Sequence, residues 1–306
     1  MSNFNSMLQK KVQYVEDVLK RRGVLVEEGY QHTVIEAMNY ALMDGGKRLR
    51  PLIMSEVYSM FSNNASSQNK DDIESFMTAL EMIHTYSLVH DDLPAMDNDD
   101  YRRGRKTCHI VYGEDMAILT GDALLNRAFE VALNGADKKT PEEAVRVLKA
   151  LQLMASKAGI FGMVGGQVFD VESETLEKAN TLEEILFIHR LKTSALLQVA
   201  FMAGGILAGA SEKDIELLSI VGENVGIAFQ IKDDILDVTS TQEVLGKPIG
   251  SDEKNNKTTY VSLVGLKQAE EDVEMYSKLA IDSFDMLSSK NEFLRELIFS
   301  LVSREK

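Results

Sequence analysis

Proline and cysteine are scarce in this chain, whose 306 residues include four prolines and one cysteine. The prolines are Pro51, Pro94, Pro141 and Pro248. Because proline interrupts helices, their wide spacing leaves long segments free to be helical. The single Cys108 excludes an internal disulfide and a multi-cysteine metal site, and it is typical of a reducing compartment. We therefore expect an all-α protein of the cytoplasm.

Long apolar runs are also missing. The longest stretch, Ala195 to Ala210, contains Gln198 and several small residues, which favours a buried helix over a membrane span. The first 23 residues are polar and charged, without the apolar region of a signal peptide. No linker or fixed-period repeat divides the chain, so we expect one domain over residues 1–306 and no membrane span.

Positive charge is in deficit, because 33 Lys and Arg residues face 48 Asp and Glu residues and give a formal charge of −15. Binding to nucleic acid requires basic surface that replaces counterions, so we expect no nucleic-acid partner. An anionic ligand can bind such a chain only where local cations or a bound metal reverse the field.

Acidic residues gather in two clusters inside otherwise apolar helical segments. The first is Asp91, Asp92 and Asp97, and the second is Asp233, Asp234 and Asp237. Pro94 should end the first helix near Leu93, so that the chain can fold Asp97 back towards Asp91. The second cluster has no such interruption and should lie on one face of a continuous helix.

Carboxylates this close repel one another unless a cation lies between them. Mg²⁺ suits the clusters because it binds a few carboxylates and completes its shell with water and phosphate oxygens. Mn²⁺ is possible as well. A solvated acidic helix end remains the alternative for either cluster taken alone, but unpaired charge in apolar surroundings is costly and favours the metal.

Basic residues occur in two short groups. Gly45 and Gly46 form a turn before Lys47, Arg48 and Arg50. A second group, made of Arg102, Arg103, Arg105 and Lys106, comes directly after the first acidic cluster. The planar fork of arginine and the mobile charge of lysine suit phosphate oxygens, although a solvated basic face is the alternative for either run.

Together these motifs resemble the trans-prenyltransferase (polyprenyl synthetase) family, most closely its bacterial farnesyl diphosphate synthase branch. The similarity runs from about Asn39 to Leu266. It rests on residues 45–51, His84, 87–97, 102–104, 121–124, 165–170, 192–193, 230–237, 245–247 and 257–260. Two positions depart from the family pattern: Lys106 stands where a proline is usual, and Asn98 replaces an aspartate.

The resemblance implies the isoprenoid synthase fold, a bundle of long antiparallel helices around a central cavity, usually as a homodimer. It also implies roles for individual side chains. Isopentenyl diphosphate would be held by Gly46, Lys47, Arg50, His84 and Arg103. Mg²⁺ would be held by Asp91 and Asp97 with Asp92, and by Asp233 with Asp234 and Asp237. The allylic diphosphate would be held by Arg102, Lys192, Thr193, Gln230 and Lys247. Gln167, Asp170 and Lys257 belong to a possible further site.

The implied activity joins isopentenyl diphosphate head to tail to dimethylallyl or geranyl diphosphate and gives farnesyl diphosphate. A geranylgeranyl diphosphate synthase is the close alternative, and a non-catalytic subunit of a heteromeric prenyltransferase is the alternative of another class. Tyr86, five residues before Asp91, is expected to close the product cavity, because the neighbouring Ser87 is too small to do so. We expect His32, His90, His109 and His189 to be structural or surface groups rather than ligands, and we expect a lid over Thr239–Thr259.

Overall fold

The computed structural model describes residues 2–62, 67–134, 139–175, 181–239 and 258–302. About 79% of the described residues are helical, which confirms the expected all-α class. Lys247, Lys257 and all but the ends of the expected lid lie outside the described residues. The chain forms two compact units, Met1–Leu151 and Gln152–Lys306, which we call unit 1 and unit 2 and describe one at a time.

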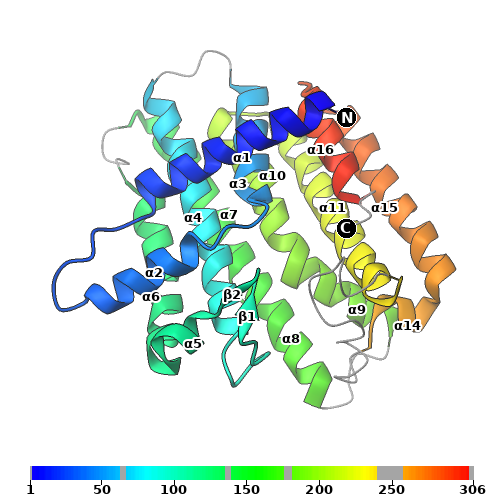
Figure 1. The fold of residues 1–306 in the computed structure, drawn as a ribbon. Coiled ribbons are helices and arrows are strands. Elements are labelled where there is room, and N and C mark those ends of the chain that lie inside the picture. The colour runs from blue at the N-terminus through cyan, green and yellow to red at the C-terminus, as the bar shows by residue number, and fades with distance from the viewer. Residues whose placement is uncertain (1, 63–66, 135–138, 176–180, 240–257, 303–306) are drawn as a thin grey trace. The chain divides into compact units, whose positions relative to one another are not determined.

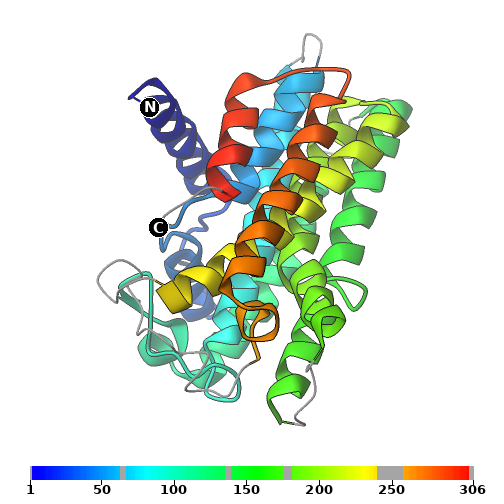
Figure 2. The ribbon, with the colours of Figure 1, turned by 90° about the vertical axis from the view of Figure 1, so that its right-hand side faces the viewer.

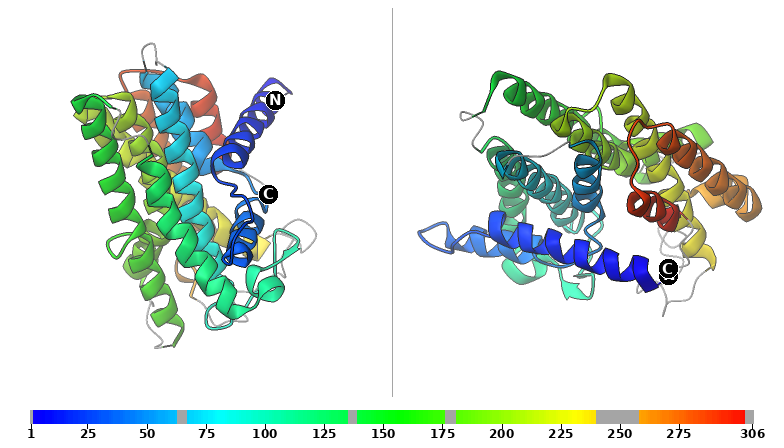
Figure 3. Two further views of the ribbon diagram at one scale, coloured as in Figure 1. Left: turned by 90° about the vertical axis from the view of Figure 1, so that its left-hand side faces the viewer. Right: turned by 90° about the horizontal axis from the view of Figure 1, so that it is seen from above.

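Unit 1 is built around one long helix, α4 (Figure 1). Its elements are α1 (Ser2–Arg22), α2 (His32–Leu42), α3 (Leu49–Phe61), α4 (Ser67–Asp91), β1 (Tyr101–Arg102), β2 (Arg105–Lys106), α5 (Cys108–Tyr112) and α6 (Glu114–Ala132). The helix α7 (Pro141–Ala158) contains the boundary between the units. α4 packs against α1, α2, α3 and α6, and Figure 3 shows it beside α6. Phe76, Met77 and Leu80 of α4 are fully buried. They fix the helix that carries the first acidic cluster.

Unit 2 is built around a second long helix, α11 (Figure 2). Its elements are α8 (Met163–Thr175), α9 (Leu182–Ile188), η2 (His189–Ser194), α10 (Ala195–Ala208), α11 (Glu212–Thr239), α14 (Tyr260–Val264), α15 (Leu266–Asp285) and α16 (Glu292–Val302). α11 packs along α10 and α15. The second acidic cluster lies inside this unbroken helix, as the sequence predicts.

An apolar cluster in unit 2 lies beneath the second acidic motif. It joins α9, α11, α14 and α15 through Ile185, Ile188, Ile227, Ile231, Ile235, Tyr260, Val261, Ala269 and Val273. Because closely packed side chains resist displacement, this cluster fixes the position of the motif relative to α9 and α14.

Two helical stretches, 141–173 and Leu182–Ala208, are long and apolar enough by composition to cross a membrane. In the second stretch 67% of the apolar window is buried inside the protein, as in a core helix, and in the first stretch 33% is buried. Length and hydropathy of one or two helices are weak grounds for a membrane span, since core helices meet the same criteria.

Candidate active site

The first acidic motif lies where α4 ends. The helix stops at Asp91, and the backbone N–H of Asp97 donates to the carbonyl oxygen of Asp91 at 2.8 Å. Asn98 adopts a left-handed conformation (φ 53°) and donates from its backbone to Leu93. Asparagine is one of the few residues that tolerate this conformation. The predicted return of the chain from Asp97 to Asp91 is therefore confirmed at the level of the backbone.

Asp92 and Arg102, predicted for different ligands, are bound to each other. Asp92 is only 4% exposed, and its Oδ1 accepts from Nε of Arg102 at 2.7 Å and lies 2.6 Å from Nη2. Burial raises the pKa of the Asp92 carboxyl, and the guanidinium of Arg102 acts in the opposite direction. A charge-assisted pair of this kind ties the hairpin β1–β2 to the end of α4.

The hairpin turns through Arg103 and Gly104, which have φ values of 52° and 81°. Positive φ at both central residues is the mark of a type I′ turn, whose twist matches that of the flanking strands. Lys106 pairs with Tyr101 in the hairpin, and its carbonyl accepts the hydroxyl of Tyr40 at 2.7 Å. The lysine that departs from the family pattern is thus compatible with a regular hairpin.

The hairpin turn places the guanidinium of Arg103 against Gly45 and Gly46, the two glycines that precede α3. Arg103 Nη1 donates to the carbonyl of Gly45 at 2.8 Å, and a Cβ atom at Gly46 would lie 2.7 Å from Cζ of Arg103. Gly46 also has a φ of 109°, which side-chain-bearing residues rarely adopt. Gly46 is therefore required for this approach and touches the cation directly.

Arg50 and His84 lie next to each other, with Nη1 of Arg50 3.4 Å from Nε2 of His84. Burial lowers the pKa of His84 well below its usual value, and the positive charges of Arg50 and Arg103 lower it further. Burial also lowers the pKa of both arginines. Nε of Arg50 is buried and makes no hydrogen bond to any of the described residues. A buried unpaired donor among cations fits an anionic ligand.

Arg48, by contrast, is fully used within the protein. It is 3% exposed and donates to Glu16, Glu81 and the carbonyl of Leu42 at 2.6, 2.8 and 2.8 Å. Of the three cations in its sequence run, this one therefore stabilises the junction of α1, α2 and α4.

Tyr86 lies in α4 and is 7% exposed. Burial and the nearby Asp91 carboxylate raise its pKa to about 12, so the phenol stays neutral at physiological pH. Ser87 donates its hydroxyl to the carbonyl of His84 at 2.8 Å and is thereby held on its own helix.

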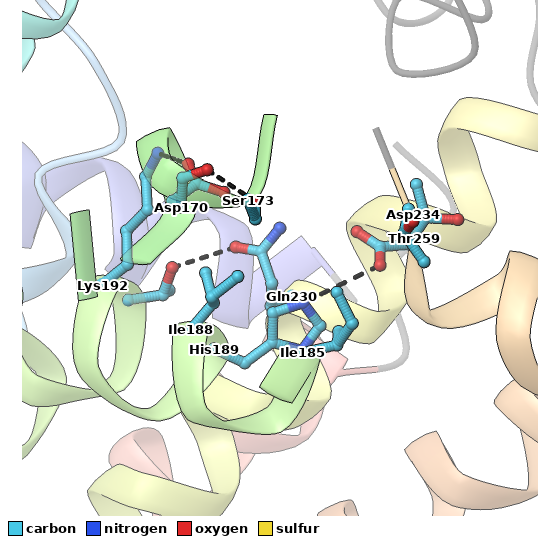
Figure 4. Close-up of a pocket in the computed structure, with 11 residues that line it drawn as sticks. Asp170, Ser173, Ile185, Ile188, His189, Lys192, Gln230, Asp234 and Thr259 are labelled. Carbon is cyan, nitrogen blue, oxygen red and sulfur yellow. Dashed lines mark hydrogen bonds and ion pairs between the residues drawn. The ribbon is translucent and has the colours of Figure 1, made fainter. Parts of the chain in front are cut away.

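Unit 2 carries a cavity of about 130 Å³ (Figure 4). Its lining combines residues predicted for the allylic site with Asp170, His189 and Asp234, which were predicted for other roles, and with others that the sequence did not single out. They are Asp170, Ser173, Ile185, Ile188, His189, Lys192, Thr193, Gln230, Asp234, Thr258 and Thr259. Lys192 Nζ lies 2.6 Å from Asp170 Oδ2, and the Thr193 hydroxyl donates to Gln230 at 2.9 Å. Gln167 is half-buried on α8 and is absent from this lining.

A π-helical turn, η2, brings Lys192 and Thr193 into the wall of the cavity. The Ser194 hydroxyl donates to the carbonyl of His189, five residues back, at 3.0 Å. Two glycines leave room for the wide turn: a Cβ atom at Gly166 would clash with the backbone N of Lys192, and one at Gly226 would lie 2.6 Å from Cα of Ser194. Such turns are rare and occur frequently at functional sites. Sequence periodicity gave no signal for it.

Asp234, like Asp92, is hydrogen bonded to a residue of its own unit. Its Oδ2 accepts the backbone N–H of Tyr260 at 2.9 Å and lies 3.8 Å from Nε2 of His189. The His189 ring stacks on Tyr260 with ring centroids 6.1 Å apart. Burial lowers the pKa of His189 to about 4. Asp234 therefore anchors the start of α14 to α11.

The carboxylates of the two acidic motifs suit Mg²⁺ whose coordination is completed by water or phosphate oxygens. Within the described ranges, no three His, Cys, Asp or Glu side chains come together as a metal cluster. Mg²⁺ is commonly held by one or two carboxylates, with waters and substrate phosphates completing its octahedron. Asp91 and Asp97 in unit 1, and Asp233 and Asp237 in unit 2, have the hard oxygen donors that such an ion requires.

Comparison with known proteins places these motifs in a family. Residues 31–297 match the model of the polyprenyl synthetases, and the chain belongs to this family. It is 43% identical to the farnesyl diphosphate synthase of Micrococcus luteus over 98% of this chain and 100% of that one. It is 42% identical to the geranylgeranyl diphosphate synthase of Cyanophora paradoxa over 90% of this chain and 88% of that one.

Solved structures agree with this assignment. The geranyltransferase of Helicobacter pylori, solved with magnesium and isoprenyl diphosphate, superposes with a TM-score of 0.83 at 29% identity, over 97% of this chain and 95% of that one. The isoprenoid synthase fold expected from the motifs is therefore confirmed.

Proposed function

We propose that this chain is a Mg²⁺-dependent trans-prenyltransferase that condenses isopentenyl diphosphate with dimethylallyl or geranyl diphosphate to farnesyl diphosphate. The observation that carries the proposal is the cluster of the half-buried Arg50 and His84 with the exposed Arg103, in which Nε of Arg50 is buried without a hydrogen bond to any described residue, in a protein with a net charge of −15. A cyclase needs one diphosphate site, whereas a condensing enzyme needs a second. The cluster in unit 1 supports a second diphosphate site in addition to the Lys192 cavity of unit 2.

The cluster in unit 1 would bind isopentenyl diphosphate. Lys47, Arg50 and Arg103 supply positive charge, and Nε of Arg50 is a donor without a hydrogen bond to any described residue. His84 is neutral at physiological pH because its pKa lies well below the usual value, so it offers one N–H without adding charge. The cluster holds a part of the substrate that does not react.

The cavity in unit 2 would bind the allylic diphosphate. Lys192, Thr193 and Gln230 lie together there. The family resemblance, and not the cavity, makes Arg102 and Lys247 further candidates for binding this diphosphate. Asp91, Asp97, Asp233 and Asp237 would hold Mg²⁺, which when bound neutralises the diphosphate and lowers the barrier to its departure. Asp92 and Asp234 would support the two motifs from within. Gln167, Asp170 and Lys257 are proposed as a further site.

The chemistry then needs no nucleophilic side chain. The bond between C1 of the allylic substrate and its diphosphate oxygen breaks, and the double bond of isopentenyl diphosphate attacks C1. The proton lost from C2 passes to the departing diphosphate. The residues of the chain bind, orient and exclude water, which is how most of the barrier is lowered in such reactions.

A product assay tests the proposal. The purified chain is incubated with labelled isopentenyl diphosphate, geranyl diphosphate and Mg²⁺, and the fifteen-carbon diphosphate is expected as the main product. A twenty-carbon product would instead support the geranylgeranyl alternative. Absence of turnover by the chain alone, restored by a second subunit, would support the non-catalytic alternative. Full turnover in excess chelator would contradict the metal requirement.

We also propose that the chain works as one prenyltransferase domain over residues 1–306 and as a cytoplasmic homodimer. One family model spans both units, which supports a single functional domain. Exposed apolar side chains on α6 and α7, namely Ile118, Leu119, Val145 and Leu148, suit a partner copy. Light scattering coupled to gel filtration should give twice the mass of one chain, and a monomer that keeps full activity would contradict the dimer.

A further inference from the structure

Tyr86, the residue proposed to close the product cavity, is in contact with another ring. His90 lies one helical turn further along α4, and the two ring centroids are 5.9 Å apart with an interplanar angle of 79°. Side chains four residues apart lie on the same face of a helix, so the contact follows from their spacing. An edge-to-face contact of this kind holds one ring against the other.

The His90 ring is fixed from its other side by α6. Nε2 of His90 lies 3.0 Å from the carbonyl oxygen of Ile118. A carbonyl oxygen can only accept, so Nε2 is the nitrogen that carries the hydrogen. The imidazole is therefore held at two points, by the α6 backbone and by the Tyr86 ring.

Gly121 of α6 makes the space that the His90 ring occupies. A Cβ atom at this position would clash with Nε2 and Cδ2 and would lie 2.7 Å from Cε1. Glycine inside a helix costs about 1 kcal/mol relative to alanine. A glycine in the middle of α6 is accounted for by the ring that packs against it, which also explains the glycine of the motif at 121–124.

We propose that His90 and Gly121 determine product length by positioning Tyr86. The proposal rests on the proposed function, because it concerns the floor of the cavity in which the product grows. While His90 is held between Ile118 and Tyr86, the phenol ring keeps its orientation and stops the chain at fifteen carbons. When the imidazole is lost or displaced, Tyr86 gains room to turn aside and the product lengthens.

Replacement of the imidazole is the first test. His90→Ala should raise the ratio of twenty-carbon to fifteen-carbon product by roughly 2- to 10-fold, the factor that corresponds to one edge-to-face ring contact. His90→Phe, which keeps a ring against Tyr86, should retain the fifteen-carbon product. An unchanged ratio in His90→Ala would overturn the proposal.

Gly121→Ala tests the same contact from α6. The added methyl group should displace the imidazole and lengthen the product in the same direction as His90→Ala. In a His90→Ala background the clash is removed, so Gly121→Ala should change the ratio no further. Additive effects of the two changes would contradict a shared mechanism. If His90→Ala does not fold, Gly121→Ala still decides the outcome.

Two controls separate a positioning role from a loss of stability. His109 is a buried imidazole of unit 1, hydrogen bonded to Thr107 and remote in sequence from Tyr86. His109→Ala should lower the melting temperature without changing the product ratio. In a Tyr86→Ala background, His90→Ala should leave the ratio unchanged, and a further lengthening there would show that His90 does not act through Tyr86. No labelled product from the wild type would refute the proposed function itself.

Discussion

Each of the two acidic motifs consists of an adjacent pair of aspartates followed by a third, but the two motifs are built differently. In unit 1 the helix ends within the motif, and the chain returns through a backbone hydrogen bond from Asp97 to Asp91. In unit 2 the motif lies inside an unbroken helix of 28 residues. In both, the second aspartate is buried and bound to its own unit: Asp92 to Arg102, and Asp234 to the backbone of Tyr260.

The comparison shows that the two aspartates of each adjacent pair differ in role. One carboxylate of each pair holds a neighbouring element in place. The remaining aspartates of the motifs are those that we propose to hold Mg²⁺. The cations differ as well. In unit 1, burial and then the charges of Arg50 and Arg103 lower the pKa of His84, whereas Lys192 of unit 2 is paired with Asp170. Unit 1 should therefore bind an anion with less rearrangement than unit 2.

The largest expected effect comes from the first aspartate of each motif. Asp91→Ala and Asp233→Ala should each lower kcat/KM on the order of 10³-fold, since charge that stabilises the leaving diphosphate is lost. Circular dichroism should show unchanged helicity. Full activity in one of the two variants would mean that the motifs are not equivalent, and loss of helicity would point to a structural role.

The second aspartates should act on stability, and unequally. Asp92→Ala leaves the guanidinium of Arg102 without its buried partner and should lower the free energy of unfolding by about 3 kcal/mol. Asp234→Ala removes one buried acceptor and should cost about 1–2 kcal/mol. Urea titrations measure both. The double variant Asp92→Ala with Arg102→Ala should recover part of the loss, and no recovery would show that the pair is not the cause.

Cys108 reports on unit 1 alone because it is the only cysteine in the sequence. Burial raises the pKa of its thiol to about 11 from a usual value of 9.0. At pH 8 the thiolate fraction should therefore be about a hundredfold lower than for a free thiol, and reaction with a disulfide reagent correspondingly slow. The rate should rise as the pH approaches 11. Fast reaction at pH 8 in the folded protein would show that unit 1 opens at this point.

The smallest effects are expected from the cationic side chains. Each substitution should raise the KM of one substrate and not of the other. Lys47→Ala and Arg103→Ala should raise KM for isopentenyl diphosphate about tenfold, because these groups bind a part that does not react. Lys192→Ala should raise KM for the allylic substrate by a similar factor, and Arg102→Ala should act on the same substrate. Steady-state kinetics with each substrate varied in turn measure these effects. Equal effects on the KM of both substrates would contradict the division of the sites.

The sequence alone determined the all-α class, because proline is rare and apolar residues recur at helical spacing. It also located the two acidic motifs, and Pro94 predicted the return of the chain at Asp97. These features depend on neighbours a few residues apart, so local chemistry is sufficient to predict them. The family motifs extended the prediction to Lys192, Thr193 and Gln230, which line the cavity of unit 2.

Only the tertiary structure decided which partner each polar residue takes. Asp234 binds Tyr260, 26 residues away, and the ring of His90 packs into the space left at Gly121 on another helix. The π-turn that presents Lys192 also depends on room left by Gly166 and Gly226 on neighbouring helices. Such contacts depend on how closely distant segments approach, and close packing rather than local propensity sets that distance.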